Sequence, residues 1–133
     1  MKTRHLTRGL FLVLLFSFSI FMVLPAFAGD ISGTVKRDSD NQPIAGVWVY
    51  ANDYSTWSSG GSAQTAADGT YTITGLAAGG YRVQAIAYGT DYVVEYYNNT
   101  TYSNSAAQVA VTAGQTTSNI DFSLALGGRI SGV

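Results

Sequence analysis

The sequence predicts an all-β protein, an antiparallel β-sandwich of about seven strands, on three observations. Apolar and polar residues alternate with a period of two in most segments from residue 31 onward, as in strands with one buried face. Turn-forming residues recur about every dozen residues along the same region. No window there has the 3.6-residue period of an amphipathic helix. Short strands with frequent turns are typical of a sandwich.

The first 28 residues predict a secretory signal peptide. Basic residues precede an apolar run over residues 10–24, and the triplet Ala26-Phe27-Ala28 forms a small-x-small cleavage pattern. The run is shorter than the about 20 residues that a transmembrane helix needs, so we interpret it as a signal sequence rather than an anchor. Cleavage after Ala28 would leave a mature chain of residues 29–133, secreted or at the cell surface, with no membrane span.

The first half of the mature chain predicts two strands and a loop. Residues 31–36 alternate between apolar or small and polar side chains, and the polar run over residues 36–43 predicts a turn because Asp, Asn and Pro favour turns. Residues 45–53 predict the second strand, with its valines on one face and its aromatic residues on the other. Residues 54–63 are rich in glycine and serine and predict a long loop.

Residues 68–85 predict two further strands joined by a corner. Asp68-Gly69 is a tight-turn signal, since glycine readily adopts positive φ. Alternation follows over residues 70–74, and Leu76 is expected to fill the end of the core. The small residues of "AAGG" predict a close reversal into the return strand over residues 81–85.

Three later segments, residues 91–99, 107–115 and 119–126, predict the remaining strands. The apolar residues that share the inner faces of all these strands form the predicted core. They are Ile31, Val35, Val47, Val49, Tyr71, Ile73, Leu76, Tyr81, Val83, Val109, Val111, Ile120, Phe122 and Leu124.

A short internal echo bears on domain organisation. Ile31-Ser32-Gly33 recurs as Ile130-Ser131-Gly132, 99 residues later, which is one domain length. We interpret residues 29–127 as one domain and residues 128–133 as the start of a truncated second repeat or a linker. The native protein would then be a tandem array. A chance recurrence in a glycine-rich sequence is the alternative.

The composition excludes several classes of chemistry. The chain has no cysteine, and its one histidine, His5, lies in the predicted signal peptide. After cleavage, four basic residues remain against eight acidic ones, a net charge of −4 without a basic patch. Zinc peptidase sites and Ser-His-Asp triads need histidine, and nucleic-acid binding needs positive charge. No two carboxylates are brought into one pocket by the pattern, so we expect no enzymatic activity, no cofactor, no metal and no nucleic-acid partner.

The motifs in three of the predicted strands resemble those of the carboxypeptidase regulatory-like domain. That family has a G-x-V first strand, a P-[LI]-x-G-V second strand and the pattern T-D-x-x-G-x-Y-x-[IF]-x-x-L-x-x-G-x-Y. The matching residues are Gly33, Val35, Pro43, Ile44, Gly46, Val47, Asp68, Gly69, Tyr71, Ile73, Leu76, Gly79 and Tyr81. Gly80 departs from the family, which often has threonine there. The later stretches "EYYNN" and "TAGQTTSNIDFSLALGG" resemble a bacterial tandem-repeat subtype.

The resemblance implies a transthyretin-like or prealbumin-like Greek-key sandwich in a superfamily shared with starch-binding and other carbohydrate-binding folds. It also implies a non-catalytic accessory module of a secreted or surface protein, since members are named for a domain attached to a carboxypeptidase. We therefore expect a spacer, display or interaction unit whose partners are neighbouring modules of the same protein. Kinship of fold alone does not assign a ligand.

The aromatic residues form the candidate binding site. Twelve lie in the mature chain, and only some fit the predicted core faces. Flat rings next to amide side chains suit sugars, which stack through C–H groups and hydrogen-bond through hydroxyls. The alternative is that these rings pack under loops or against a neighbouring module. The candidate residues for stacking on a polysaccharide are Trp48, Tyr50, Tyr54, Trp57, Tyr96 and Tyr97.

An internal isopeptide bond, as in related adhesin stalk sandwiches, is a second candidate. Lys36 ends the first predicted strand and Asn119 starts the last, which fits the two partners of such a bond. The reaction also needs a buried carboxylate that follows a "GxYxxxE" strand. This chain has "YRVQA" at that place, without an acid. We therefore expect no isopeptide bond.

A calcium site is a third candidate, in the turn that contains Asp38, Asp40 and Asn41. These residues offer oxygen ligands at close spacing. The glycine and terminal glutamate of an EF-hand loop are both missing, so we interpret the segment as a solvated turn.

Overall fold

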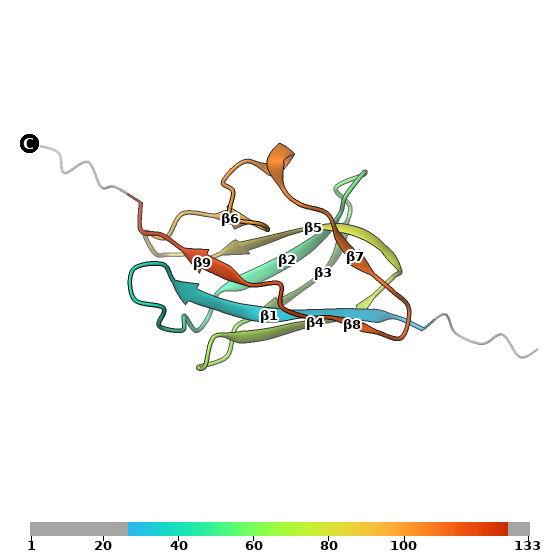
Figure 1. Cartoon of the computed structure of the whole chain (residues 1–133), viewed down its shortest axis with the longest axis horizontal. Helices are drawn as coiled ribbons and strands as arrows, with labels where there is room; N and C mark the ends of the chain where they lie inside the picture. Colours follow the sequence, from blue (N-terminus) through green and yellow to red (C-terminus); the bar gives the residue numbers. More distant parts are fainter. Residues whose placement is uncertain (1–26, 128–133) are drawn as a thin grey trace, which may run out of the picture.

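The computed structural model describes residues 27–127 and folds them into two β-sheets that face each other (Figure 1). Most of the predicted signal peptide (1–28) and all of residues 128–133 lie outside the described residues. Among residues 27–127, no helix is long and apolar enough to cross a membrane. The elements are β1 (Gly29–Arg37), β2 (Trp48–Asp53), β3 (Ser59–Gln64), β4 (Thr70–Leu76), β5 (Gly79–Ile86), β6 (Glu95–Tyr96), the 3-10 helix η2 (Ser103–Ser105), β7 (Val109–Val111), β8 (Thr116–Thr117) and β9 (Phe122–Leu124).

The strand β1 is central to the first sheet. It pairs with β4 in antiparallel orientation along one edge and with β8 and β9 along the other. The second sheet has the order β3-β2-β5, and both β6 and β7 pair with β5. The predicted β-sandwich, rich in antiparallel pairs, is confirmed. The pairings of β1 with β8 and with β9 are parallel, which the alternation pattern did not predict.

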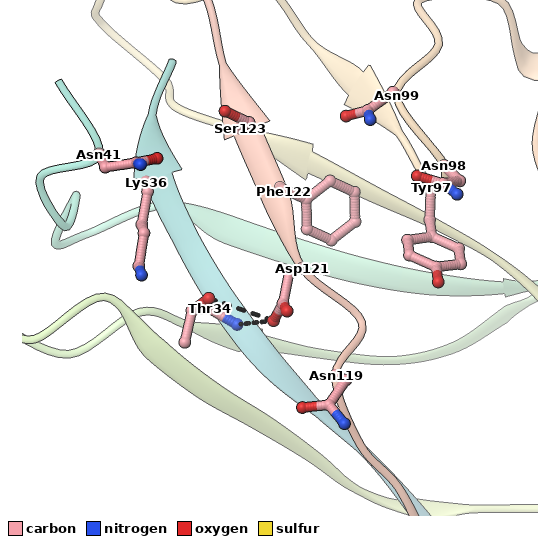
Figure 2. Close-up of a pocket in the computed structure, with 10 residues that line it drawn as sticks. All are labelled: Thr34, Lys36, Asn41, Tyr97, Asn98, Asn99, Asn119, Asp121, Phe122 and Ser123. Carbon is pink, nitrogen blue, oxygen red and sulfur yellow. Dashed lines mark hydrogen bonds between the residues drawn. The ribbon is translucent and has the colours of Figure 1, made fainter. Parts of the chain in front are cut away.

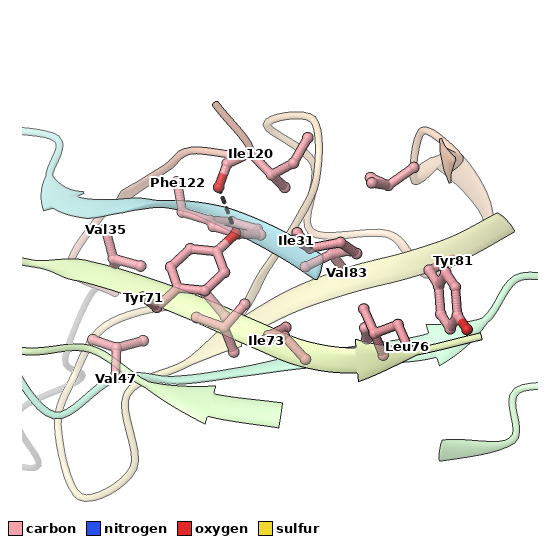
Figure 3. Close-up of a cluster of buried hydrophobic side chains, with 14 of the residues drawn as sticks. Ile31, Val35, Val47, Tyr71, Ile73, Leu76, Tyr81, Val83, Ile120 and Phe122 are labelled. Atoms are coloured by element: carbon pink, nitrogen blue, oxygen red, sulfur yellow. Dashed lines mark hydrogen bonds between the residues drawn. The ribbon is translucent and has the colours of Figure 1, made fainter. Parts of the chain in front are cut away.

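The core lies between the two sheets (Figure 3). All fourteen predicted core residues are buried there, and the structure adds Ala51, Ala85 and Ala87. Leu76 is fully buried at the point where β4 ends, as the sequence predicts. Each Val, Leu or Ile side chain removed from water stabilises the fold by about 1.5–3 kcal/mol, so alternation in the sequence translates directly into the sandwich.

Residues 59–64 form the strand β3, and the prediction of a loop over residues 54–63 is therefore wrong for its second part. The strand pairs with β2 from Ala51↔Gly61 to Trp48↔Gln64. The absence of a side chain at Gly61 allows close packing, because a Cβ there would lie only 3.0 Å from Ile73 Cγ2. A glycine-rich segment thus closes the edge of the second sheet against β4.

The prediction of a strand over residues 91–99 is wrong for most of that segment, because only Glu95–Tyr96 forms a strand there. Two different partners divide the segment. The amide of Val93 donates to the carbonyl of Ala125 at 2.9 Å, whereas the amide of Tyr96 donates to the carbonyl of Thr100 at 2.7 Å in a turn. The pattern of alternating residues does not reveal such a change of partner.

The predicted turn and corner around β4 are both present. At the turn, the hydroxyl and amide groups of Thr70 donate to the Asp68 carboxylate, at 2.6 and 3.1 Å, and hold its pKa below the usual range. At the corner, the chain crosses from the first sheet to the second, and the Tyr81 hydroxyl donates to the carbonyl of Ala77 at 2.6 Å.

A buried hydrogen bond joins the middle of the chain to its last strand. The hydroxyl of Tyr71, which is 4% exposed, donates to the carbonyl of Ile120 at 2.5 Å (Figure 3). Burial raises the pKa of Tyr71, and the nearby Asp121 carboxylate adds to the effect. The amide of Ile120 donates to the carbonyl of Ser32 at 3.0 Å. A Cβ on Gly33 would lie only 1.9 Å from the Ile120 oxygen, so this crossing requires glycine.

We predict that Tyr71→Phe destabilises the domain by about 1–3 kcal/mol, because it leaves the Ile120 carbonyl without a donor in a buried place. Urea denaturation of the full chain measures the change. Tyr102→Phe is the matched control, since its ring is 73% exposed, and we expect no measurable effect. Equal stability of the two variants would contradict the assigned role of the Tyr71 hydroxyl.

Candidate functional site

The outer surface of the second sheet carries two aromatic rings side by side. On β2, Trp48 and Tyr50 alternate with the buried Val49 and Ala51, and the buried Val47 directly precedes the strand, so the half-buried rings face away from the core. Their ring centroids are 6.1 Å apart and their planes differ by 24°. The two rings are therefore nearly parallel and stacked, and the pair forms an aromatic patch on the outside of the sheet.

Polar side chains on neighbouring strands surround these rings. Gln64 lies opposite Trp48 on β3, and Gln84 lies opposite Tyr50 on β5. Tyr96 is the register partner of Gln84 on β6, which extends the surface by one strand. We call Trp48, Tyr50, Tyr88 and Tyr96, with Gln64 and Gln84, the aromatic face. Side-chain amides beside flat rings provide the donors and acceptors that hydroxyl-rich ligands need.

Tyr88 joins the aromatic face although the sequence analysis did not select it. Its ring is 62% exposed, and its hydroxyl donates to the Tyr50 hydroxyl at 3.4 Å. This neighbouring hydroxyl raises the pKa of Tyr50, with burial as the next cause. Tyr88 follows the end of β5, and a pattern of alternation alone does not place a residue that lies in a loop.

Tyr54 and Trp57 contact Arg82 at the end of β2. The guanidinium carbon of Arg82 lies 4.0 Å from the centroid of the Tyr54 ring and 4.3 Å from that of Trp57. Arg82 also donates to the carbonyls of Tyr54 and Ser103. We call these three side chains the Arg82 stack. The cation occupies one ring face of each aromatic residue, which favours the packing interpretation for Tyr54 and Trp57.

The loop that carries Trp57 is fixed by Asp53. Its carboxylate accepts hydrogen bonds from the amides of Thr56 and Ser55, at 2.8 and 2.9 Å, and these bonds lower the pKa of Asp53. The amide of Trp57 donates to the carbonyl of Asp53 at 2.9 Å. Trp57 is still 43% exposed, so its ring is accessible on the side away from Arg82.

Tyr97 lies apart from the aromatic face. Its half-buried ring packs against the core and meets Phe122 edge-on, with centroids 6.3 Å apart and planes at 72°. The six predicted stacking residues thus divide into three sets. Trp48, Tyr50 and Tyr96 lie on the aromatic face, Tyr54 and Trp57 lie in the Arg82 stack, and Tyr97 packs inward.

A polar hollow of about 370 Å³ lies over β1 and β9 (Figure 2). Its lining residues are Thr34, Lys36, Asn41, Tyr97, Asn98, Asn99, Asn119, Asp121, Phe122 and Ser123. Backbone conformation accounts for three of the asparagines, because Asn41, Asn99 and Asn119 have φ values of 60°, 54° and 64°. Asparagine tolerates this left-handed region better than most residues.

Lys36 and Asn119, the two candidates for an isopeptide bond, both border this hollow and are exposed. In Figure 2 the Thr34–Asp121 hydrogen bonds are drawn between them. The Asp121 carboxylate is exposed and accepts from the amide and hydroxyl of Thr34, at 2.9 and 3.1 Å.

Asp38 and Glu95 come together at Ser123, although the sequence pattern did not bring two carboxylates to one place. The Ser123 hydroxyl donates to Asp38 at 3.1 Å, and its amide donates to Glu95 at 3.4 Å. Burial raises the pKa of Glu95, and the charge of Asp38 adds to the effect. The bonds tie β9 to β6 and to the turn after β1.

The predicted solvated turn is held by its own side chains. The Asp40 carboxylate accepts from Arg37 Nε and from the Gln42 amide, at 3.1 and 3.2 Å, and pairs with the Arg37 guanidinium. Within residues 27–127, no three His, Cys, Asp or Glu side chains gather as metal ligands would. The absence of a metal or cofactor from the protein's function stays a prediction.

Comparison with known proteins gives a family and a fold. The model of the carboxypeptidase regulatory-like domain matches residues 30–125. A search of curated protein sequences found no match.

Two similar solved structures are the TIE protein of Bacillus anthracis and GBS52, the minor pilin of the gram-positive pathogen Streptococcus agalactiae. The TM-scores are 0.53 and 0.57, at 15% and 14% identity, over 75% and 81% of this chain. The matched regions cover 17% and 48% of those two chains, so this chain spans less than half of either. At such low identity the likeness concerns the fold alone.

We predict that the intact mass of the purified chain equals that of an unmodified polypeptide with the same termini. The reason is that Lys36 and Asn119 are exposed and the carboxylate between them is occupied by Thr34. High-resolution mass spectrometry measures this directly. A mass lower by one ammonia, absent from Lys36→Ala, would overturn the prediction.

We also predict that Arg82→Ala loosens the loop that carries Trp57. The substitution removes two cation–π contacts, each worth about 0.5–1 kcal/mol or more, along with hydrogen bonds to two loops. Tryptophan fluorescence is expected to shift to longer wavelength as the ring becomes solvated. Arg37→Ala, which removes the Arg37–Asp40 surface pair, is the control. An unchanged spectrum for Arg82→Ala would show that the stack does not hold the loop.

Proposed function

Because the chain belongs to the carboxypeptidase regulatory-like domain family, we propose that it is a non-catalytic extracellular module that acts as a spacer or display unit. The parent protein would be secreted or attached to a cell surface. The signal-like pattern of the first 28 residues supports export. The fold shared with a minor pilin of a gram-positive pathogen supports a place in a surface assembly.

The parallel pairing of β1 with β9 is the observation that carries this proposal. Val35 pairs with Phe122 and Arg37 with Leu124, so the first and last strands run in the same direction. The chain therefore enters at one end of the sandwich and leaves at the other (Figure 1). The nine residues of β1 alone span about 30 Å. Copies joined end to end would add length rather than fold back on each other.

The polar groups of the domain support a structural role. The carboxylates of Asp53, Asp68 and Asp121 each accept hydrogen bonds from backbone amides. Asp40 is paired with Arg37, and Asp38 and Glu95 accept from Ser123. Acidic side chains that hold turns and strand junctions are engaged in the fold, which is why we propose no catalytic role for them.

We predict that one, two and three copies of residues 29–127 joined in series form progressively longer particles. Each added copy is expected to extend the maximum dimension by at least about 30 Å, since β1 lies along the module. Small-angle X-ray scattering measures these dimensions. Particles that become rounder as copies are added, with little gain in length, would contradict the spacer function.

A second candidate function is carbohydrate binding on the aromatic face. The stacked, nearly parallel rings of Trp48 and Tyr50, with the amides of Gln64 and Gln84 beside them, support it. A sugar ring would stack through its C–H groups on an exposed part of this aromatic pair and hydrogen-bond to the amides. The partner would be a polysaccharide chain that lies across the strands of the second sheet.

Affinity electrophoresis identifies polysaccharides that retard the protein in a gel. For any such polysaccharide, we predict that Trp48→Ala weakens the binding affinity about three- to tenfold, because one stacking contact is lost. Trp57→Ala is the matched control, because Trp57 belongs to the Arg82 stack, and its retention is expected to stay unchanged. Equal losses in both variants, or no retention by a panel of β- and α-linked glucans, xylans, mannans and chitin, would reject this function.

A further inference from the structure

We propose that this module bears tension along its length, and that β1 together with residues 115–124 forms the element that resists it. We call this pairing the β1 seam. The proposal rests on the spacer function, since only a spacer is pulled at its two ends. It assigns a mechanical activity to contacts that a passive spacer does not require.

The β1 seam is bonded along nearly its whole length. Two short parallel ladders form it, Asp30↔Thr116 and Ile31↔Thr117 with β8, and Val35↔Phe122 to Arg37↔Leu124 with β9. Backbone and side-chain bonds extend these ladders and join them. They are Asp30 N to Gln115 O at 3.0 Å, Ile120 N to Ser32 O at 3.0 Å, Thr34 N to Asp121 Oδ1 at 2.9 Å and Asp38 N to Leu124 O at 2.9 Å.

The direction of the strands determines how tension acts on these bonds. A pull at the two chain ends draws β1 by its first residue and β9 by its last residue, in opposite directions along the strands (Figure 1). Interstrand hydrogen bonds run across the strands, so this pull shears them. Sheared bonds are loaded together and several must break in one step. Bonds that are peeled from one end break one at a time.

The gap between the two ladders is where slippage would start, and two side chains close it. The Asp121 carboxylate accepts from the amide and the hydroxyl of Thr34. The Tyr71 hydroxyl holds the Ile120 carbonyl from the core side, at 2.5 Å. The close approach at Gly33 brings the crossing segment against β1. The interruption of the ladder is thus spanned by these side-chain bonds together with one backbone bond, from Ile120 N to Ser32 O.

The other edge of β1 adds to the resistance. β4 pairs with it in antiparallel orientation from Thr34↔Thr70 to Gly29↔Leu76. Ile31 and Val35 on β1 are fully buried, so any sliding of this strand also drags apolar side chains through the packed core. The strand β1, which receives the pull at its first residue, is therefore held on both edges and on its inner face.

Constant-force stretching of single molecules tests the proposal through the direction of pull. In one arrangement the full chain carries handles at both ends. In the other arrangement, the N-terminal handle is moved to Ser39→Cys, just after β1, and the C-terminal handle stays. This pull separates the adjacent ends of β1 and β9 and peels the same seam. The chain has no cysteine of its own, so this attachment is unique. At equal force we expect unfolding to be at least about tenfold faster in the peeling arrangement. The reason is that peeling breaks one hydrogen bond at a time, and the free energy of a single bond corresponds to about a tenfold change in rate.

A pair of matched variants tests the side chains that close the gap. Asp121→Ala removes an acceptor of two hydrogen bonds within the seam. Thr65→Val removes a hydroxyl that accepts from the Val47 amide and donates to the Ile44 carbonyl, outside the seam. Urea denaturation measures the equilibrium stability of each variant. With end handles we expect Asp121→Ala to unfold about tenfold faster under force than Thr65→Val, after correction for any difference in stability.

Each outcome decides the proposal. Equal unfolding rates in the two pulling directions, or equal rates for the two variants, would overturn it. The spacer function is judged separately by the scattering experiment on joined copies. A module that lengthens the particle yet unfolds equally fast in both directions would therefore be a spacer that bears no tension.

Discussion

The hydroxyl of Tyr71 and the carbonyl of Ile120, 2.5 Å apart, connect the middle of the chain to its end. This contact holds residues 118–121 across β1 at Gly33, where a Cβ would lie only 1.9 Å from the Ile120 oxygen. The crossing then places Phe122 and Leu124 over the core and aligns β9 with β1. The crossing thus joins the parallel pairing of β1 with β8 to its parallel pairing with β9.

Much of the fold could be predicted from the sequence, because alternation reports burial directly. The core includes the alternate residues Tyr71 and Ile73 of β4 and Tyr81 and Val83 of β5, and also Val49 of β2, which alternates with aromatic residues. The parallel partner of β1 could not be predicted, since the two strands lie more than 80 residues apart and pairing leaves no local pattern. The strand β3 was missed because its glycines resemble those of a loop, although Gly60 permits close contact with Tyr81 and Gly61 with β4.

The candidate site was predictable to the same extent and for the same reason. Trp48 and Tyr50 lie on a regular strand, so their outward direction follows from the burial of Val47 and Val49. Tyr54, Trp57 and Tyr97 lie in or next to irregular segments, where tertiary contacts decide which way a ring points. Arg82 determines the environment of Tyr54 and Trp57, and Phe122 that of Tyr97, and neither partner is close in sequence.

These features separate the two surfaces of the molecule by role. The first sheet contains β1 and the strands that connect the two ends of the domain, whereas the second sheet presents the aromatic face. In such a module, the first sheet connects the two chain ends, and the second sheet presents its aromatic face to a binding partner. Changes to the aromatic rings need not disturb the strands that hold the ends in place.

The parallel orientation of β1 and residues 115–124 places the two chain ends at opposite ends of the domain. Interstrand nuclear Overhauser contacts measure this orientation most directly. We expect the parallel pattern, with Asp30 near Thr116 and Arg37 near Leu124. An antiparallel pattern, with Asp30 near Leu124 and Arg37 near Thr116, would contradict it.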